Sequence, residues 1–140
     1  MQIVLCISLK VNSMQMIEVK LEQKANTKEL LVYVTNKHKT DYFMDQMLLF
    51  KDGKYSLDCL MIYDAEGNKL YRRRTARLFA SKFPEDYITL KPEQTYSTSI
   101  KLDDFFNINS NYIDVQYDAS NSYPGIGMDK ITSETLRMSF

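Results

Sequence analysis

The segment that decides the fold is Tyr87–Tyr117, which reads YITLKPEQTYSTSIKLDDFFNINSNYIDVQY. Near its centre, two sets of residues alternate along the chain. Tyr96, Thr98, Ile100 and Leu102 form one set, and Ser97, Ser99 and Lys101 form the more polar one. A period of two is typical of a β-strand with one buried face and one face in water. Together with Ile88–Leu90 and Tyr112–Tyr117, this run predicts three strands joined by a Pro-bearing turn and a short bend.

Comparable patterns elsewhere in the chain predict further short strands. We expect them over Ile17–Leu21, Leu30–Thr35, Leu57–Tyr63, Lys69–Tyr71 and Thr135–Phe140, with Met1–Val11 as a β-rich opening run. Leu30–Thr35 is apolar nearly throughout, which is typical of a central strand buried on both faces or close to it. About eight short strands without a long helical period predict an all-β fold, an immunoglobulin- or fibronectin-like antiparallel β-sandwich.

Four segments between these strands are harder to assign. Tyr42–Phe50 fits one or two helical turns about as well as a strand, and its strand neighbours favour a strand. Arg72–Pro84 is expected to be a long polar connection. Asp118–Lys130 is expected to be a loop because it is rich in Ser, Asn, Gly and Pro. A bend or single helical turn is expected over Asp103–Asn109, with Asp103 as its candidate cap.

Length, composition and charge narrow the classes of protein. A chain of 140 residues with 44% hydrophobic residues has the size of one globular domain, which we place over residues 1–140. It has 18 basic and 18 acidic residues and a formal net charge of zero, whereas nucleic-acid binders usually carry a basic excess. We therefore expect no nucleic-acid partner. We also expect no membrane span, because no apolar run approaches about 20 residues.

The first 16 residues allow two interpretations. The apolar run IVLCISL has the length of a signal-peptide core, but no positive charge precedes it and no small-residue cleavage site follows it. This favours an extra strand over the remnant of a leader, and a cytoplasmic location and a secreted or periplasmic one both stay open. Cys6 and Cys59 lie in apolar runs and are expected to be buried free thiols, with a disulfide between strands as the alternative.

Residues that usually carry catalysis are scarce. His38 is the one histidine, in a polar loop between two lysines, so the sequence offers neither an ordinary Ser-His-Asp triad nor a His-Glu-x-x-His zinc motif. The acidic pairs Glu85-Asp86 and Asp103-Asp104 consist of adjacent residues, which point to opposite sides of an extended chain. We therefore expect no enzymatic activity, no cofactor and no metal site.

Two segments are candidate contact sites for a protein partner. The first holds the most concentrated positive charge of the chain, in Arg72, Arg73, Arg74 and Arg77. Arginine forks pair well with carboxylates on a partner surface, although a solvated loop is the alternative. The second is the segment SNSYPGIGM at residues 120–128, with three side chains expected to be exposed, Tyr123, Ile126 and Met128. Exposed apolar residues on a stable scaffold often mark an interface, and a loop folded onto the domain is the alternative.

Several of these motifs occur together in one known family. They are, in chain order, LLVYV with TNKHKTDYF, the hairpin IYDAEGNKLY, the basic connection RRRTARL, the run DYITLKPEQTYSTSIKLDDFFNI, the strand YIDVQY and the closing segment SETLRMSF. This succession, over Ile17–Phe140, resembles the non-catalytic N-terminal β-sandwich domain of zinc endopeptidases of the deuterolysin and peptidyl-Lys metallopeptidase group. Glu93 stands where the family usually has a turn glycine, and Phe106 is near where a tyrosine is common.

The resemblance implies a non-catalytic sandwich of the kind that accompanies a protease, since the catalytic motif of that family is missing from this sequence. It therefore suggests a protein-binding module whose partner is a metallopeptidase, which the module would accompany or inhibit by covering the active-site cleft. Two alternatives stay open. The ten tyrosines allow a carbohydrate-binding sandwich, and pairing of edge strands would give a structural, self-associating domain.

Overall fold

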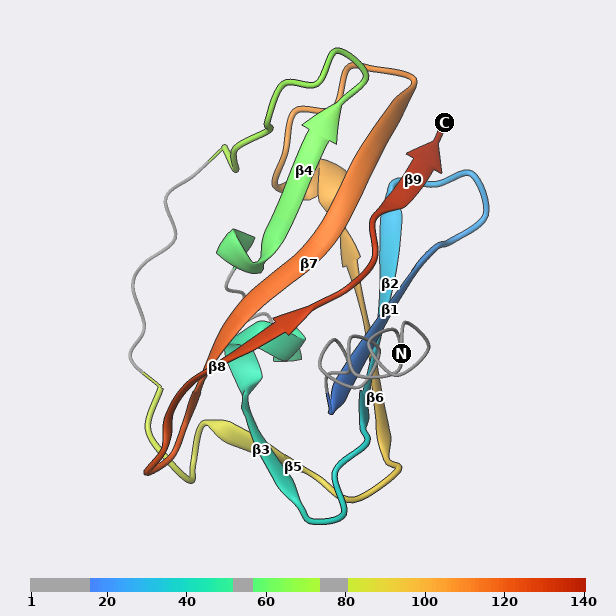
Figure 1. Ribbon diagram of the computed structural model, residues 1–140. Coiled ribbons are helices and arrows are strands. Elements are labelled where there is room, and N and C mark those ends of the chain that lie inside the picture. The colour runs from blue at the N-terminus through green and yellow to red at the C-terminus, as the bar shows by residue number, and fades with distance from the viewer. Residues whose placement is uncertain (1–15, 52–56, 74–80) are drawn as a thin grey trace, which may run out of the picture.

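The computed structural model describes residues 16–51, 57–73 and 81–140, and its main elements are β-strands (Figure 1). The strands in chain order are β1 (Ile17–Gln23), β2 (Glu29–Asn36), β3 (Tyr42–Asp45), β4 (Leu60–Asp64), β5 (Tyr87–Leu90), β6 (Thr95–Lys101), β7 (Tyr112–Tyr123), β8 (Gly127–Thr132) and β9 (Leu136–Ser139). Short 3₁₀ turns occupy Gln46–Leu49, Leu57–Cys59 and Leu102–Asp104. The strands pair in antiparallel fashion, so the fold is all-β, as the sequence predicts.

One sheet has the strand order β1-β2-β6, with β2 in the centre. β1 buries every second residue, Ile17, Val19 and Leu21, as its alternating pattern predicts. β2 does the same from Leu30 to Val34, while the residues between them are half-buried. The central position of β2 is therefore confirmed, and of its two faces one is buried and the other half-buried.

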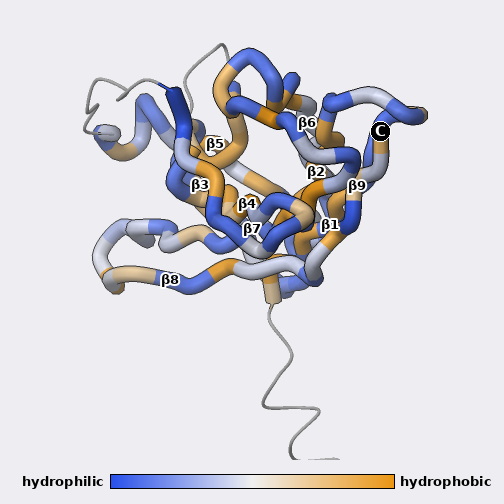
Figure 2. Tube along the Cα trace, turned by 90° about the horizontal axis from the view of Figure 1, so that it is seen from above, coloured by the Kyte–Doolittle hydropathy of each residue, from blue (hydrophilic) through white to orange (hydrophobic). Residues whose placement is uncertain are grey.

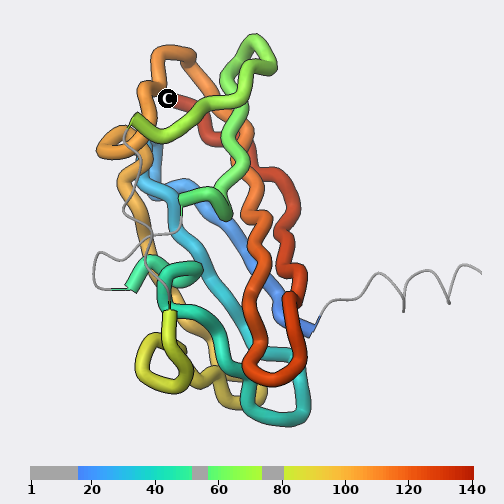
Figure 3. The backbone as a smooth tube through the Cα atoms, turned by 90° about the vertical axis from the view of Figure 1, so that its left-hand side faces the viewer, coloured from blue at the N-terminus to red at the C-terminus, as the bar shows by residue number. Residues whose placement is uncertain are grey.

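A second sheet is built around β7, the longest strand. β4 pairs with β7 along one edge, from Leu60 opposite Tyr117 to Asp64 opposite Ile113. β8 and β9 both pair with the other edge of β7, β8 with its C-terminal half and β9 with its N-terminal half. The β7–β8 hairpin extends to the lower end of the molecule in Figures 1 and 3, the end that also holds the loop between β2 and β3.

A β-bulge separates β8 from β9. Asp118 lies opposite Thr132 and Val115 lies opposite Leu136, so the two β7 residues 116–117 face the three residues 133–135. At this place Ser133 donates its N–H to the Tyr117 carbonyl oxygen, and its Oγ accepts the Tyr117 N–H at 2.9 Å. The side chain of Ser133 thus replaces the ladder bond that the extra residue displaces.

A small sheet of β3 and β5 lies at the lower end of the molecule, beside the C-terminal half of β7 (Figure 1). β3 is joined to β7 by the amide side chain of Asn121, which accepts the Asp45 N–H and donates to the Phe43 carbonyl oxygen, each at 3.0 Å. Asn36, which is also fully buried, links the end of β2 to the end of β5 by donating to the Leu90 carbonyl oxygen at 2.8 Å. Two buried asparagines therefore hold this end of the molecule where main-chain ladders stop.

The structure corrects several assignments. Tyr42–Phe50 is a short strand followed by a 3₁₀ turn, since Asp45 accepts the Met47 N–H and ends β3. Lys69–Tyr71 contributes a single bridge, opposite Tyr63, rather than a strand. Asp118–Lys130 is not a loop, because the alternation of β7 continues through it into the hairpin.

Two further details near β4 and β6 differ from expectation. Leu57–Tyr63 begins with a 3₁₀ turn, so the strand proper starts at Leu60. The turn after β6 begins one residue earlier than expected, at Leu102, with Lys101 in the capping position and no side-chain cap bond. Asp103 is therefore not a cap.

The sheets share one hydrophobic core. Every strand contributes at least one buried residue to a single cluster, which includes Leu30 of β2, Met44 of β3, Ile62 of β4 and Ile131 of β8. In Figure 2 hydrophobic and hydrophilic residues alternate along the tube, as expected for strands that bury one face. The expected strand within residues 1–16 falls almost wholly outside the described residues.

Candidate functional site

The tip of the β7–β8 hairpin exposes two large apolar side chains. Ile126 is 84% exposed and Met128 is 69% exposed, and we call these two residues the apolar tip. The turn between the strands closes by a hydrogen bond from the Ile126 N–H to the Tyr123 carbonyl oxygen at 3.1 Å. Gly125 occupies the left-handed region at φ 78°, which explains why glycine is needed there. The predicted exposure of Ile126 and Met128 is confirmed, whereas Tyr123 is half-buried.

A buried polar network holds the base of this hairpin. Tyr42 donates its hydroxyl proton to Asp129 Oδ2 at 2.5 Å and accepts a hydrogen bond from Asn121 Nδ2 at 3.0 Å. Burial, and then the hydrogen bond to Asp129, raise the pKa of the Tyr42 hydroxyl far above its usual range, so it stays protonated and keeps donating. Because Asn121 is fully buried and bonded on both its amide atoms, the hairpin has one defined position against β3.

Aromatic side chains surround the base of the hairpin. Phe43 contacts Tyr123 and Phe83, with ring centroids 6.0 Å and 5.3 Å apart. Tyr87 contacts Phe83 edge-on and donates its hydroxyl to the Ser122 carbonyl oxygen at 2.6 Å. Phe83 is itself 47% exposed, so it adds apolar surface to this end of the molecule.

The described part of the basic segment, residues 72–73, follows β4 and lies away from the apolar tip, as Figures 1 and 3 show. Arg73 is used within the fold: its guanidinium donates to the Asp103 carbonyl oxygen and its N–H to the Phe105 carbonyl oxygen at 2.8 Å. Arg72 lies 3.8 Å from Asp58. Arg74 and Arg77 lie outside the described residues, so the separation from the apolar tip is shown for Arg72 and Arg73.

The histidine and one of the acidic residues considered for catalysis, His38 and Asp86, take part in local structure. His38 stacks on Tyr42 with ring centroids 5.4 Å apart, and its N–H is bound by the Asn36 side chain. Asp86 accepts hydrogen bonds from Gln46 Nε2 and from the Lys82 N–H. Across residues 16–51, 57–73 and 81–140, no three His, Cys, Asp or Glu side chains are placed to hold a metal ion.

Cys59 is a buried free thiol, as predicted. Burial raises its pKa well above that of an ordinary thiol, with the neighbouring Asp58 charge acting in the same direction. A protonated, enclosed thiol is a poor nucleophile, so Cys59 acts as a small apolar residue. The prediction for Cys6 falls outside the described residues.

Sequence reasoning missed the residues that hold the site. Tyr42, Phe83 and Asn121 lie far apart in the sequence, each about 40 residues from the next. Only the fold brings them to one end of the molecule. One signal was available: the alternation Ile113, Val115, Tyr117, Ala119 continues to Asn121 and would have placed its side chain inward.

Comparisons with known proteins do not extend this description. No protein-family model matches the chain, and a search of curated proteins returned no match. In the described part of the chain, no helix combines the length and apolar character needed to cross a membrane. The likeness to the deuterolysin group therefore stays a prediction from the sequence.

Proposed function

We propose that this chain is a non-enzymatic β-sandwich module of the immunoglobulin or fibronectin kind, which binds another protein through the end that carries the β7–β8 hairpin. The sandwich arrangement is supported by two sheet groups, β1-β2-β6 and β4-β7-β8 with β9, whose buried residues join one core. β3 and β4 both contact β7, β4 through a main-chain ladder and β3 through the side chain of Asn121, so all three strands belong to the same core.

The observation that carries the proposal is the exposure of the apolar tip on a well-held hairpin. Single exposed apolar residues are common on protein surfaces, but here Ile126 and Met128 lie two residues apart at one end of a hairpin. The half-exposed Phe83 adds apolar surface beside the hairpin base, because it contacts Tyr87, which is bonded to Ser122 of β7. The buried Asn121 network fixes the hairpin before any partner arrives. A preorganised apolar projection is well suited to filling a cleft, because little conformational entropy is lost on binding.

The partner class comes from the family resemblance. A sandwich that accompanies a zinc endopeptidase would bind such an enzyme, and a projecting hairpin that covers its cleft would inhibit it by occlusion. Arg74 and Arg77 are proposed as a second contact, through pairing with carboxylates on the partner. The scarcity of catalytic groups in the sequence supports a binding role over an enzymatic one.

The first experiment measures inhibition of a purified deuterolysin-type zinc endopeptidase acting on casein. We expect the protein to slow hydrolysis, and the double variant Ile126→Glu, Met128→Glu to lose that effect because two charges would be desolvated in the contact. Phe140→Glu is the matched control, since Phe140 is 37% exposed and lies at the other end of the molecule (Figure 1). Equal inhibition by both variants would show that the hairpin is not the contact.

A second experiment needs no assumption about the enzyme. A photo-crosslinking amino acid is placed at Ile126 or, as control, at Phe140, and the cross-linked products are compared. A protein product specific to position 126 supports the proposal. A self-linked dimer at that position would instead favour the self-associating domain, and glycan-array binding lost in a Tyr71→Ala variant would favour the carbohydrate-binding one.

A further inference from the structure

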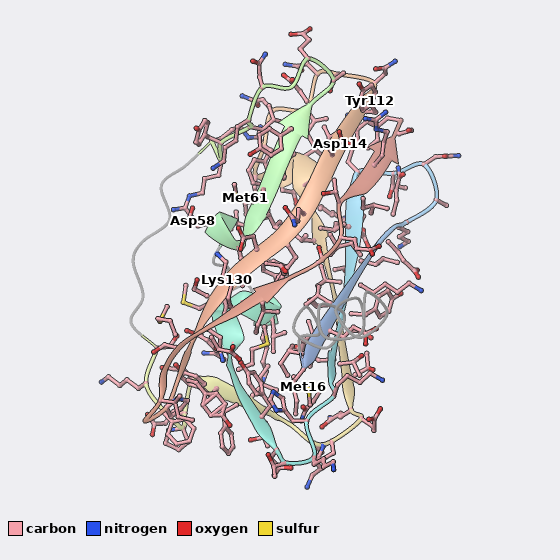
Figure 4. All side chains as sticks on the ribbon, viewed as in Figure 1. Met16, Asp58, Met61, Tyr112, Asp114 and Lys130 are labelled. Carbon is pink, nitrogen blue, oxygen red and sulfur yellow. The ribbon has the colours of Figure 1, made fainter. Side chains whose placement is uncertain are left out.

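A pocket of about 400 Å³ opens beside β4, away from the β7–β8 hairpin tip. Its described lining is formed by Leu57, Asp58, Leu60, Lys69, Leu70, Tyr71, Arg72 and Phe106. This volume lies in the range of pockets that hold small ligands. Figure 4 labels Asp58 on the 3₁₀ turn that precedes β4.

The floor of the pocket is apolar. Leu57, Leu60 and Phe106 are each less than 6% exposed and belong to the hydrophobic core, and Leu70 packs against them half-buried. These side chains are held by the surrounding sheet, so the floor exists without a ligand. It can receive an aliphatic or aromatic group but offers such a group no side-chain hydrogen bond.

The rim of the pocket is charged. Arg72 and Lys69 contribute two cations, and Asp58 contributes one carboxylate. Lys69 is held over the ring of Tyr71 at 5.3 Å, and Tyr71 is an exposed side wall. The balance of charge at the mouth is therefore positive, which favours an anionic ligand.

Arg72 has few partners for a side chain that is largely shielded from water. Its side chain is 18% exposed, yet within the described residues its one ion-pair partner is Asp58, 3.8 Å away, and no hydrogen bond from its guanidinium is found. Two other arginines differ: Arg73 binds a carbonyl oxygen, and Arg137 forms a two-bond fork with Asp114. A shielded guanidinium with five donors is strongly favoured to bind an acceptor.

We propose that this pocket binds the carboxylate of a ligand whose other part is apolar. The Arg72 guanidinium forms the bidentate pair that a carboxylate fits, and the Lys69 ammonium adds a second positive charge. The apolar part of the ligand lies on the floor formed by Leu57, Leu60 and Phe106. Two sources supply this chemistry, the C-terminus of a peptide that ends in an apolar residue and a fatty acid.

This site is separate from the apolar tip, so its existence does not depend on the proposed protein contact. The carboxylate of Asp58 has a definite role in it: it is the weak partner that the ligand displaces from Arg72. Because the Asp58 side chain is 80% exposed, replacing it leaves the core intact. Asp58→Asn should therefore strengthen ligand binding by removing both the competing charge and its repulsion of the ligand.

The test is a titration followed by NMR of ¹³C-labelled leucine methyl groups in the full chain. The probes are the tripeptide N-acetyl-Ala-Ala-Leu, its C-terminal amide, and octanoate. We expect shifts at Leu57, Leu60 and Leu70 and none at Leu31 or Leu90, which lie outside the pocket. The amide should bind at least about tenfold more weakly than the acid, since it lacks the charge that Arg72 pairs with.

Variants identify the groups responsible. Arg72→Gln should weaken the acid at least about tenfold, Asp58→Asn should tighten it a few-fold, and Arg137→Gln should leave it unchanged. Binding of the tripeptide alone identifies a peptide C-terminus, and equal or tighter binding of octanoate identifies a fatty acid; either result supports the site. The proposal is overturned if no probe shifts the pocket leucines at millimolar concentration, or if acid and amide bind alike. If Arg72→Gln does not fold, weaker or unchanged binding by the folded Asp58→Asn variant also overturns it.

Discussion

In the first half of β7, residues 113–117 pair through the main chain with β4 and residues 112–115 with β9, whereas residues 118–123 pair in this way on one side, with β8. The second half is also tied to β3, by the side chain of Asn121. The first half is therefore held by a ladder that tolerates many side chains. The second half depends on one buried amide, and it carries the apolar tip.

The hairpin leaves the hydrophobic core between Ile131 and Ile126, so the same substitution should have different costs at these two positions. Ile131 of β8 is 1% exposed and lies opposite Ala119, while Ile126 at the tip is 84% exposed. Ile131→Ala should lower the free energy of unfolding by about 4 kcal/mol through lost burial and a cavity. The same substitution at Ile126 should change it by less than about 0.5 kcal/mol. Urea unfolding measures both, and similar costs would show that the tip is packed.

The next prediction removes the amide that holds the second half. In Asn121→Leu, the Asp45 N–H, the Phe43 carbonyl and the Tyr42 hydroxyl each lose a partner, which should cost about 3 kcal/mol. Hydrogen exchange should accelerate in residues 118–132 and stay slow in residues 112–117. Asn107→Leu, at an exposed position, is the control and should cost less than about 0.5 kcal/mol. Uniform acceleration along β7 would contradict the division into halves.

A third prediction concerns the junction between the halves. Tyr117 is fully buried and donates its hydroxyl to the Leu48 carbonyl oxygen at 2.5 Å. Burial raises the pKa of this hydroxyl well above its usual range, so it donates at any ordinary pH. Tyr117→Phe should cost about 1.5 kcal/mol, because the Leu48 carbonyl is left unpaired. Tyr33→Phe on β2 is the control, because Tyr33 is half-buried and no hydrogen bond of its hydroxyl is found within the described residues. It should change stability little. Urea unfolding of both variants tests whether the Tyr117 hydroxyl bond stabilises the fold.

The same division explains what the sequence could predict. The alternation through Ile113 and Val115 is strong, and the strand it predicts over residues 112–117 is present. In residues 118–130 the composition is that of a loop, and it led to a wrong prediction. The strand there has the small Ala119 and the polar Asn121 at its inward positions, where apolar residues would be expected. A buried amide favours a strand only when its partners on β3 are in place, and local sequence does not contain that information.

The candidate sites also differ in whether the local sequence is enough to predict them. Exposure of Ile126 and Met128 is a local property of a turn, and it was predictable. The pocket beside β4 was not, because it needs Leu57 and Arg72 from segments on either side of β4 and Phe106 from beyond β6. The arginine run was predicted as one site, whereas the structure gives Arg72 and Arg73 different surroundings.

The smallest expected effect lies in the first half of β7, where Arg137 of β9 forms a fork with Asp114 at 2.9 and 3.1 Å. The hydrogen bonds from Arg137 are the main cause that lowers the pKa of the Asp114 carboxyl below its usual value. A carboxyl whose pKa is lowered in the folded state stabilises the fold above its unfolded pKa. That contribution is lost as the pH falls through the lowered folded value.

NMR titration of the Asp114 carboxyl carbon measures this directly. In Arg137→Gln the midpoint should rise toward the ordinary aspartate range, and the pH dependence of stability that belongs to this pair should disappear. The change in stability should be small and should shrink further at high salt, because the pair is on the surface and screened. A midpoint that does not move would show that the fork is not formed in solution. The stability of the first half would then rest on its two main-chain ladders alone, which would sharpen the contrast with the half held by Asn121.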